Sequence, residues 1–244
     1  MYDVAFRERA AYLPEVDALV VADLHAGRAA ASAVDFPLGE RGDLRDRLTA
    51  LVEADRPSTV VFAGDVLHQF GPAPEAAASA LDDLVEVCRE RGAEAVAVAG
   101  NHDGGLEAAW PGEVRTAYRT GGVIVCHGHE APDPGVVADG RGGDGDARED
   151  VALYVIGHDH PAIEIEGRKR PCFLYGEGGY RGTDLLVCPA FSRLASGSTV
   201  NRMAAADFQS PLIADADALR PIVFDPDAGE ALPFPPLGRF RRLL

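Results

Sequence analysis

The stretch "AVAVAGNHD" (residues 95–103) decides the fold, because a short apolar run ends abruptly in three polar side chains. Small and β-branched residues in such a run are typical of a buried strand. The polar residues that follow, Asn101, His102 and Asp103, are of types that bind a metal or move a proton. A single histidine beside a strand is more often a core residue than a ligand. Whether these residues form a metal site therefore depends on the other motifs of the chain.

Five further apolar runs share this character. They are short, rich in β-branched residues and bounded by polar residues or glycine, which favours buried strands. These runs cover residues 18–23, 59–64, 122–128, 153–158 and 184–190.

Two amphipathic segments separate the first three runs of the chain. Residues 41–55 and 74–92 carry apolar side chains at helical spacing, and Gly92 is placed as a C-terminal cap. The chain therefore begins as βαβαβ. After residue 110 strands follow one another with few helices, which predicts an α/β fold whose second sheet packs on the first.

Length and composition indicate a globular protein. The 244 residues, 47% of them hydrophobic, suffice for a substantial core, and we expect a single domain over residues 1–244. Residues 133–150 are rich in Gly and Asp and lack periodicity, so we expect a flexible loop there. Charges interrupt the N-terminus where a signal peptide needs an apolar run, and no segment approaches ~20 apolar residues. These features predict a cytoplasmic protein that has no membrane segment.

The cysteines predict neither a disulfide framework nor a zinc–cysteine site. Cys88, Cys126, Cys172 and Cys188 are widely spaced and form no CxxC pair, so buried free thiols are expected. Cys126 stands beside His127 as a nucleophile would beside its base. Adjacent residues of a strand point to opposite faces, however, which disfavours that pairing.

The formal net charge of −16 is large for this length, and Lys169 is the only lysine. Such a charge argues against non-specific binding to nucleic acid, because the phosphate backbone favours cationic surfaces. An acidic, lysine-poor surface also suits a protein that works in strong salt, where charges are screened within a few ångströms. Both explanations stand, and the charge alone does not exclude a nucleic-acid substrate.

Every predicted strand except the last ends in potential metal ligands. The carboxyl ends of neighbouring strands in an open α/β sheet meet at one edge, where sites are built. All seven histidines of the chain lie in these motifs, which include His68, and none occurs elsewhere. The motif residues are Asp23 and His25 in "ADLHAG", Asp65 in "AGDVLH", Asn101 to Asp103 in "GNHD", His127 and His129 in "CHGHE", and His158 and His160 in "GHDH".

The types of ligand indicate the kind of metal site. Carboxylates, imidazoles and one amide oxygen, with no thiolate, suit Mn²⁺, Fe or Zn²⁺ better than Ca²⁺ or a structural zinc. The candidates are too many for one ion of four to six ligands. Two ions about 3.5 to 4 Å apart, bridged by one carboxylate, would use them all and would favour in-line displacement at phosphorus.

The motif series D-x-H, G-D, G-N-H-D, H-G-H and G-H-x-H resembles the calcineurin-like metallophosphoesterase superfamily. The series runs from Asp23 to His160, and "ADLHAG" and "GDVLHQF" are similar to the SbcD-related branch, which includes nuclease subunits of double-strand-break repair complexes. Residues 189–203 resemble the tail of small phosphoesterases related to that branch. The resemblance implies a four-layer α-β-β-α sandwich with two facing mixed sheets.

The resemblance also implies a division of labour among the motif residues. Asp65 would bridge two divalent ions, for which Mn²⁺ is expected and Fe or Zn²⁺ are alternatives, and His102 would stay outside the coordination sphere. By this resemblance the first ion would be held by Asp23, His25 and His160, and the second by Asn101, His127 and His158.

The catalytic expectations follow from two-metal chemistry. A hydroxide that bridges the ions would attack phosphorus in line, and His102 would stabilise the phosphate or protonate the leaving oxygen. Asp103 is expected to orient His102 by a hydrogen bond. Arg28 is expected either to bind a phosphate oxygen or to be a solvated helix or loop residue, while His68 and His129 would line the substrate groove or support its loops.

Three functions remain open at this point. The first is a phosphodiesterase, including a nuclease related to DNA repair, and the second is a phosphomonoesterase that acts on a phosphoprotein or a small metabolite. The third is a non-enzymatic binding module, which the complete ligand set disfavours. The repair nucleases carry a DNA-binding cap and a region for an ATPase partner, and we expect neither here. The 84 residues after His160 are expected to complete the second sheet, so short or single-stranded nucleic acid is favoured over long duplex DNA.

Overall fold

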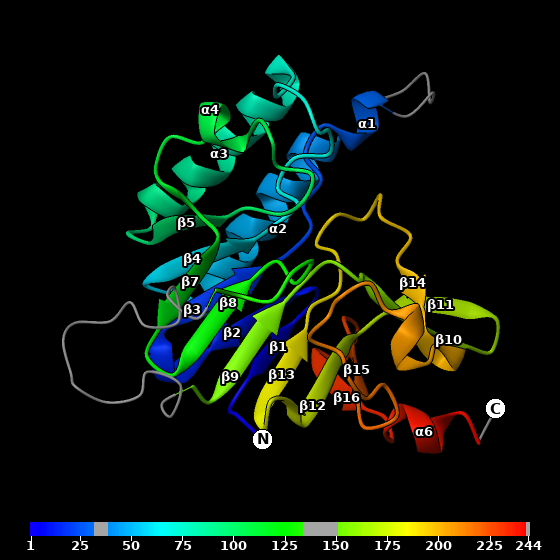
Figure 1. Ribbon diagram of the computed structural model, residues 1–244. Coiled ribbons are helices and arrows are strands. Elements are labelled where there is room, and N and C mark those ends of the chain that lie inside the picture. The colour runs from blue at the N-terminus through cyan, green and yellow to red at the C-terminus, as the bar shows by residue number, and fades with distance from the viewer. Residues whose placement is uncertain (32–38, 134–150, 243–244) are drawn as a thin grey trace.

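Two mixed β-sheets face each other and form the centre of the molecule (Figure 1). A computed structural model describes residues 1–31, 39–133 and 151–242. All of the expected loop at 133–150 except residue 133 lies outside these residues.

The first sheet has six strands in the order β1-β2-β3-β4-β5-β6. The neighbours from β3 to β6 are parallel, and β1 and β2 extend the sheet as antiparallel strands. The sequence did not predict β1 and β2. The strands are β1 (Ala5–Arg7), β2 (Ala10–Leu13), β3 (Ala18–Val21), β4 (Thr59–Ala63), β5 (Glu94–Val98) and β6 (Val114–Arg115).

The second sheet has seven strands in the order β16-β15-β12-β13-β9-β8-β7. Strands β8, β9 and β13 are parallel and the other pairs are antiparallel. Four of the seven strands come after His160, as expected. The strands are β7 (Ala117–Thr120), β8 (Val123–Cys126), β9 (Leu153–Ile156), β12 (Phe173–Tyr180), β13 (Thr183–Val187), β15 (Arg220–Asp225) and β16 (Glu230–Pro233).

Helices α2 (Glu40–Asp55) and α3 (Glu75–Glu90) pack on the outer face of the first sheet (Figure 1). Both predicted helices are therefore confirmed. The predicted cap Gly92 has a φ of +75° and its N–H donates to the carbonyl of Arg89, which ends α3. The short helices among the described residues before residue 110 are α1 (Arg28–Ala31), α4 (Leu106–Ala109) and the 3-10 helix η1 (Pro14–Val16). None of the helices within the described residues has the length and apolar character needed to span a bilayer.

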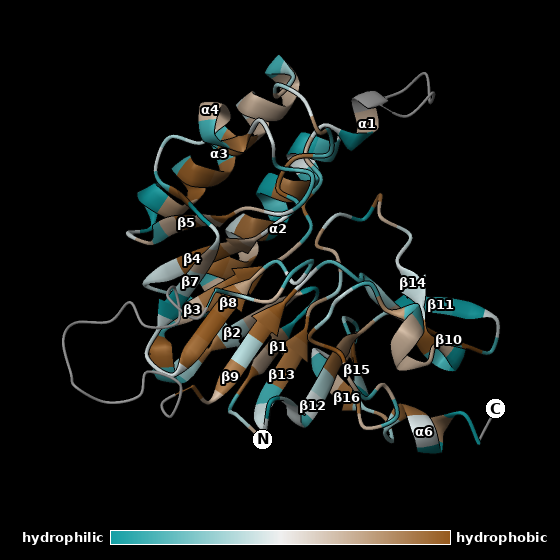
Figure 2. Ribbon diagram, viewed as in Figure 1, coloured by the Kyte–Doolittle hydropathy of each residue, from teal (hydrophilic) through white to brown (hydrophobic). Residues whose placement is uncertain are grey.

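The space between the sheets is filled by apolar side chains. Val20, Val61 and Val96 of the first sheet lie in one cluster with Val155 and Leu186 of the second. Figure 2 shows the central strands of both sheets as hydrophobic. Because β3, β4, β8 and β9 are buried on both faces, they read as continuous apolar runs rather than as alternating ones. All four cysteines are buried and free, as expected.

The predicted α/β fold with two facing mixed sheets is confirmed. Its fourth layer is built from a small sheet and short helices rather than long ones. This layer holds β10 (Pro161–Ile165), β11 (Arg168–Pro171), β14 (Ser198–Thr199), η2 (Val200–Arg202), η3 (Ala205–Asp207) and α6 (Leu237–Phe240).

The packing of α3 on the first sheet can be tested with a matched pair of leucine variants. Leu81 is completely buried, whereas Leu232 is 42% exposed. Leu81→Ala removes buried methyl groups and leaves a cavity, so it should lower the free energy of unfolding by about 2–5 kcal/mol. Leu232→Ala should cost less than about 1 kcal/mol. Urea unfolding of both variants measures the difference, and equal costs would contradict the assigned packing.

Candidate metal centre

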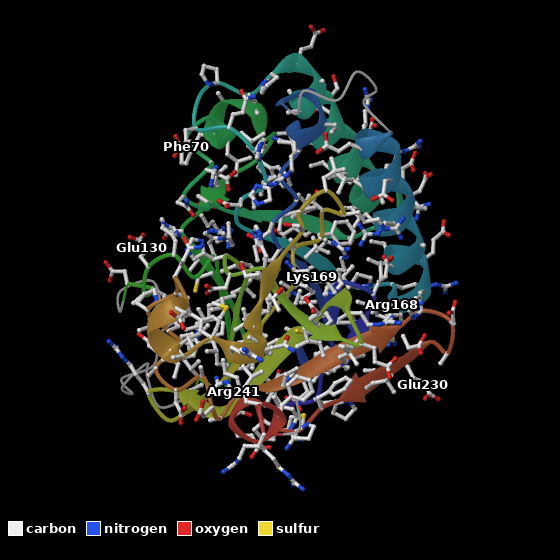
Figure 3. The ribbon with its side chains drawn as sticks, turned by 90° about the vertical axis from the view of Figure 1, so that its right-hand side faces the viewer. Phe70, Glu130, Arg168, Lys169, Glu230 and Arg241 are labelled. Atoms are coloured by element: carbon white, nitrogen blue, oxygen red, sulfur yellow. The ribbon has the colours of Figure 1, made fainter. Side chains whose placement is uncertain are left out.

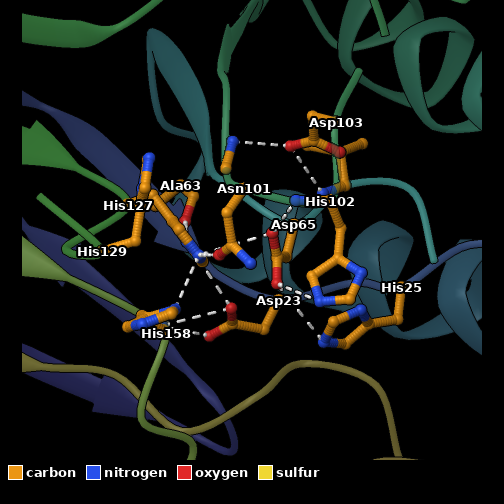
Figure 4. Close-up of polar contacts among 12 residues, drawn as sticks. Asp23, His25, Ala63, Asp65, Asn101, His102, Asp103, His127, His129 and His158 are labelled. Atoms are coloured by element: carbon orange, nitrogen blue, oxygen red, sulfur yellow. Dashed lines mark hydrogen bonds and ion pairs between the residues drawn. The ribbon is translucent and has the colours of Figure 1, made fainter. Parts of the chain in front are cut away.

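The ends of five parallel strands deliver the motif residues to one edge of the two sheets (Figure 4). Two groups of potential ligands form there, and the ligand atoms of each group lie within 4.8 Å of one another. Asp65 belongs to both groups. The first group is Asp23, His25, Asp65 and His160, and the second is Asp65, His127 and His158.

In the first group three side chains converge on a small volume. Nε2 of His160 lies 3.2 Å from Oδ1 of Asp23 and 3.2 Å from Nε2 of His25. Nε2 of His25 lies 3.9 Å from Oδ2 of Asp65. The backbone N–H of His158 donates to both carboxylate oxygens of Asp23, at 3.2 and 3.0 Å, and so fixes that carboxylate.

In the second group the ring of His127 is the central element. Its Nε2 lies 3.4 Å from Oδ1 of Asp65, 3.1 Å from Nδ1 of His158 and 3.1 Å from Oδ1 of Asn101. Asn101 therefore joins the second group, as the motif series implies. The whole site contains two carboxylates, one amide and four imidazoles that face one another.

The backbone at the site adopts an uncommon conformation. Five of the seven candidate ligands have φ between 45° and 70°, in the left-handed region that non-glycine residues seldom adopt. Such a residue carries strain of order 1–3 kcal/mol, and strain of this kind concentrates at functional sites. The five are Asp23, His25, Asp65, His158 and His160.

Two glycines make room for the carboxylates. A Cβ at Gly100 would lie 2.3 Å from both the backbone N and Oδ1 of Asp65, and one at Gly157 would lie 2.5 Å from Oδ2 of Asp23. Any side chain at either position would displace the carboxylate. The glycines that precede Asn101 and His158 in the motifs are thus part of the site, a role that the sequence analysis did not assign.

Burial sets the protonation of these groups. Removal from water lowers the pKa of His25 to about 3 and that of His158 to about 4, and it lowers the pKa of His127 well below its ordinary value. Burial likewise raises the pKa of Asp65 to about 7. Burial alone would also lower the pKa of His160, but the carboxylates of Asp23 and Asp65 raise it.

The donor set fits divalent cations. Nε2 of His25 and Nε2 of His127 each lie 3.1–3.2 Å from another imidazole nitrogen, and Nε2 of His127 also lies 3.1 Å from the amide oxygen of Asn101. Acceptors held this close repel one another unless a proton or a cation lies between them. A mixture of imidazole, carboxylate and amide ligands without thiolate suits Mn²⁺, Fe or Zn²⁺.

His102 lies beside the two groups and points toward Asp65. Its backbone N–H donates to Oδ1 of Asp65 at 3.0 Å, and its Nε2 lies 3.9 Å from Oδ2 of the same carboxylate. Nδ1 of His102 lies 3.3 Å from the carbonyl oxygen of His68. Because a carbonyl only accepts, Nδ1 carries the hydrogen, and Nε2 is the atom that faces the site.

The expectation that Asp103 orients the ring of His102 is wrong. The carboxylate of Asp103 instead accepts the backbone N–H groups of Gly100, Val66 and Leu67, at 2.7, 3.2 and 2.8 Å. It therefore ties the loop after β4 to the loop after β5, and the backbone of His68 takes the orienting role. Sequence adjacency suggested the pairing, but the side chain turns back toward its own and the neighbouring loop.

The remaining expected residues surround the two groups. Arg28 lies close enough to the first group for its positive charge to lower the pKa of His25 further, in addition to the larger effect of burial. The ring of His68 lies 5.5 Å from that of His25. His129 lies 5.2 Å from His127, on a surface cavity of about 560 Å³ that Arg181 also lines.

Two contacts that support the ligand motifs were not predicted from the sequence. Asp159, which is buried between the two histidines of "GHDH", accepts the N–H groups of Gln209 and Ser210 at 2.8 and 3.2 Å. The N–H of Phe191 donates to the carbonyl of Ala22 at 2.7 Å, so the segment after β13 holds the backbone next to Asp23 in place. The position of Asp159 between two predicted ligands of "GHDH" was the feature of the sequence that could have indicated its supporting role.

Comparison with known proteins identifies the family of the chain. A family model described as calcineurin-like phosphoesterase matches residues 17–162. No curated protein matches the chain. Among solved structures, the Pseudomonas putida nuclease MPE is similar with a TM-score of 0.59 and 22% sequence identity, over 93% of this chain and 92% of that one.

Two further structures are more distant. The phosphoesterase Yfce from E. coli has a TM-score of 0.42 and 14% identity, with 90% of this chain and 98% of that chain covered. A dimetal phosphatase from Danio rerio has a TM-score of 0.41 and 11% identity, with 89% and 98% covered.

The role of Asp103 can be tested by Asp103→Asn. The amide is uncharged and has one acceptor oxygen in place of two, so all three N–H groups lose a charged acceptor and at least one of them loses its acceptor altogether. The free energy of unfolding should fall by roughly 1.5–3 kcal/mol, as measured by urea denaturation of the metal-free protein. A variant that loses turnover but keeps its full stability would instead support the orienting role.

Proposed function

This chain belongs to the calcineurin-like phosphoesterase family, whose members hydrolyse phosphoester bonds at a dinuclear metal centre, and we propose that its substrates are phosphodiesters. Short or single-stranded nucleic acid is the class that we favour. The observation that carries the proposal is the pair of ligand groups that share the carboxylate of Asp65. One shared carboxylate between two imidazole-rich groups suits a pair of ions that act on one phosphate.

The proposed ligand sets follow the two groups. Asp65 would contact both ions, and the preferred metal is Mn²⁺, with Fe or Zn²⁺ as alternatives. The first ion would take Asp23, His25 and His160, and the second Asn101, His127 and His158. When bound, the two ions would withdraw charge from the phosphate and supply a nucleophile at neutral pH.

The protein's own groups complete the chemistry. His102 would donate a proton from Nε2 to the leaving oxygen, while its Nδ1 hydrogen stays on the carbonyl of His68. The guanidinium of Arg28 would bind a phosphate oxygen, since its charge already acts on the first ligand group. His129 would contact the substrate from the cavity beside the second group.

A phosphodiester is favoured over a phosphomonoester by the surroundings of the site. The cavity that His129 lines opens beside the second group, and the loop that carries the exposed Phe70 lies beside the first. The site therefore offers surface on both sides of a phosphate. The fold is also that of a solved nuclease. The net charge of −16 is the observation that favours the second candidate, a phosphomonoesterase for a phosphoprotein or a small metabolite. Membership of the SbcD-related branch and a link to DNA repair stay predictions.

A panel of three substrates separates the candidates. We expect the Mn²⁺-loaded protein to cleave bis(p-nitrophenyl) phosphate and labelled single-stranded DNA faster than p-nitrophenyl phosphate. Faster turnover of the monoester would favour the phosphomonoesterase. If metal binds and none of the three turns over, the binding-module interpretation would stand.

The variant His102→Asn tests the assignment of the proton donor. It should keep about two metal ions per chain, because His102 lies outside both ligand groups, and should lower turnover by roughly 10²- to 10⁴-fold. Metal content by plasma mass spectrometry and turnover of bis(p-nitrophenyl) phosphate are the measurements. Loss of metal together with activity would show that His102 is a ligand.

The variant Asp65→Ala should behave in the opposite way. Removing the carboxylate that both ligand groups share should reduce the bound metal to well below two ions per chain, and activity should fall with it. Isothermal titration with Mn²⁺ measures the loss directly. Binding of two ions with unchanged affinity would refute the shared role of Asp65.

A further inference from the structure

Phe70 is an aromatic side chain that the core does not explain. It is 68% exposed and lies at the edge of the molecule, in the loop after β4 (Figure 3). Exposure of a large aromatic ring forgoes the gain from its burial, and aromatic rings are enriched in protein interfaces and serve as stacking surfaces for nucleobases. Its neighbours indicate which kind of ligand it would take.

The ring of Phe70 stacks on the ring of His102. Their centroids lie 4.2 Å apart and their planes differ by 28°. Nε2 of His102 faces the shared carboxylate of Asp65, at 3.9 Å from Oδ2. Phe70 is therefore one side chain away from the place where the proposed proton transfer occurs, and most of its surface still faces solvent.

The loop that carries Phe70 is held in a fixed position. A Cβ at Gly104 would lie 2.9 Å from the carbonyl oxygen of Phe70, and one at Gly105 would lie 2.4 Å from that of Gly71. The two glycines thus let the loop rest directly on the chain that follows Asp103. That carboxylate also accepts the N–H groups of Val66 and Leu67, which lead into the loop.

A further hydrogen bond anchors the same loop on its other side. The N–H of His68 donates to the carbonyl of Ala26 at 3.1 Å, beside the first ligand group. Phe70 follows two residues later. A ring presented by a loop that is anchored at both flanks loses little conformational freedom on binding, which suits a preformed contact surface.

We propose that Phe70 is a stacking platform for the nucleobase of the leaving nucleoside, an inference that rests on the proposed phosphodiesterase function. If His102 protonates the leaving oxygen, the nucleoside attached to that oxygen lies on the His102 side of the site. Its base then reaches the exposed face of Phe70. Stacking on an aromatic ring accepts any base, because every base has a π-face.

Stacking also accounts for binding by an acidic protein. A net charge of −16 gives no general attraction to a polyanion. An uncharged contact between base and ring is independent of that charge and of screening by salt. Such a platform favours substrates with an unpaired base, as in single strands and short oligonucleotides, because a paired base is already stacked in its duplex.

The test compares dinucleotides that differ only in one base. The Mn²⁺-loaded protein is given thymidylyl-thymidine and two analogues, one with an abasic residue on the 5′ side of the phosphate and one with it on the 3′ side. The products that the wild-type protein forms show which of the two nucleosides is the leaving group. Phe70→Ala should lower kcat/KM for the intact dinucleotide by roughly 5- to 150-fold, the effect of removing one stacking partner. It should leave kcat/KM unchanged for the analogue whose leaving residue is abasic.

Three control variants narrow the interpretation. Phe70→Trp should retain cleavage of the intact dinucleotide, since it keeps an aromatic face, whereas Phe70→Leu should resemble Phe70→Ala. Leu232 is an exposed apolar residue on β16, and Leu232→Ala should leave kcat/KM unchanged for both the intact and the abasic dinucleotides. Because Phe70 is exposed, its variants should unfold at the wild-type urea concentration.

The outcomes distinguish this inference from the function on which it rests. An equal loss on intact and abasic substrates would overturn it, because Phe70 would then act only by holding His102. No loss on either substrate would overturn it as well. If the wild-type protein binds metal but cleaves none of the dinucleotides, the proposed phosphodiesterase function itself fails.

Discussion

The buried carboxylate of Asp65 is the constraint on which the rest of the site depends. Burial raises its pKa to about 7, which measures how poorly the surroundings solvate its charge. The chain nevertheless places this group between two sets of imidazoles, in a left-handed backbone conformation and against a glycine that leaves it room. Strain, desolvation and close packing coincide at one residue, and the binding of a cation would offset the cost of the first two.

The fold supplies this arrangement through the parallel direction of its central strands. Parallel strands end at one edge, so β3, β4 and β5 of the first sheet and β8 and β9 of the second deliver their following residues to one place. The apolar layer between the sheets holds the two edges at a fixed separation. The backbone of the segment after β13 then pairs with Ala22 and Asp23, so the site is closed from behind by a part of the chain distant in sequence.

Much of this could be predicted because buried parallel strands leave a strong pattern. The runs that lead to Asp23, Asp65 and Asn101 are almost entirely apolar, and potential ligands stand directly at their ends. Strands β1 and β2 escaped prediction since the hairpin from Ala5 to Leu13 contains charged residues, such as Arg7 and Glu8, that interrupt any apolar alternation. The partner of Asp103 escaped because side-chain direction at a strand end is set by the neighbouring loop. The exposure of Phe70 is likewise a property of the folded loop and has no signature in composition.

The net charge of −16 does not determine the field at the site itself. Its two carboxylates, Asp23 and Asp65, carry at most two negative charges, and the neutral imidazoles add none. Two divalent ions would bring four positive charges, which would exceed the charges of Asp23, Asp65 and the nearby Asp103 together, and the guanidinium of Arg28 acts in the same direction. Because acidic side chains elsewhere are screened within about 8 Å at physiological salt, a phosphate near the ions would respond to the local charge. The acidic surface therefore weakens long-range attraction of a polyanion but would not prevent a single phosphate from binding at the proposed metal centre.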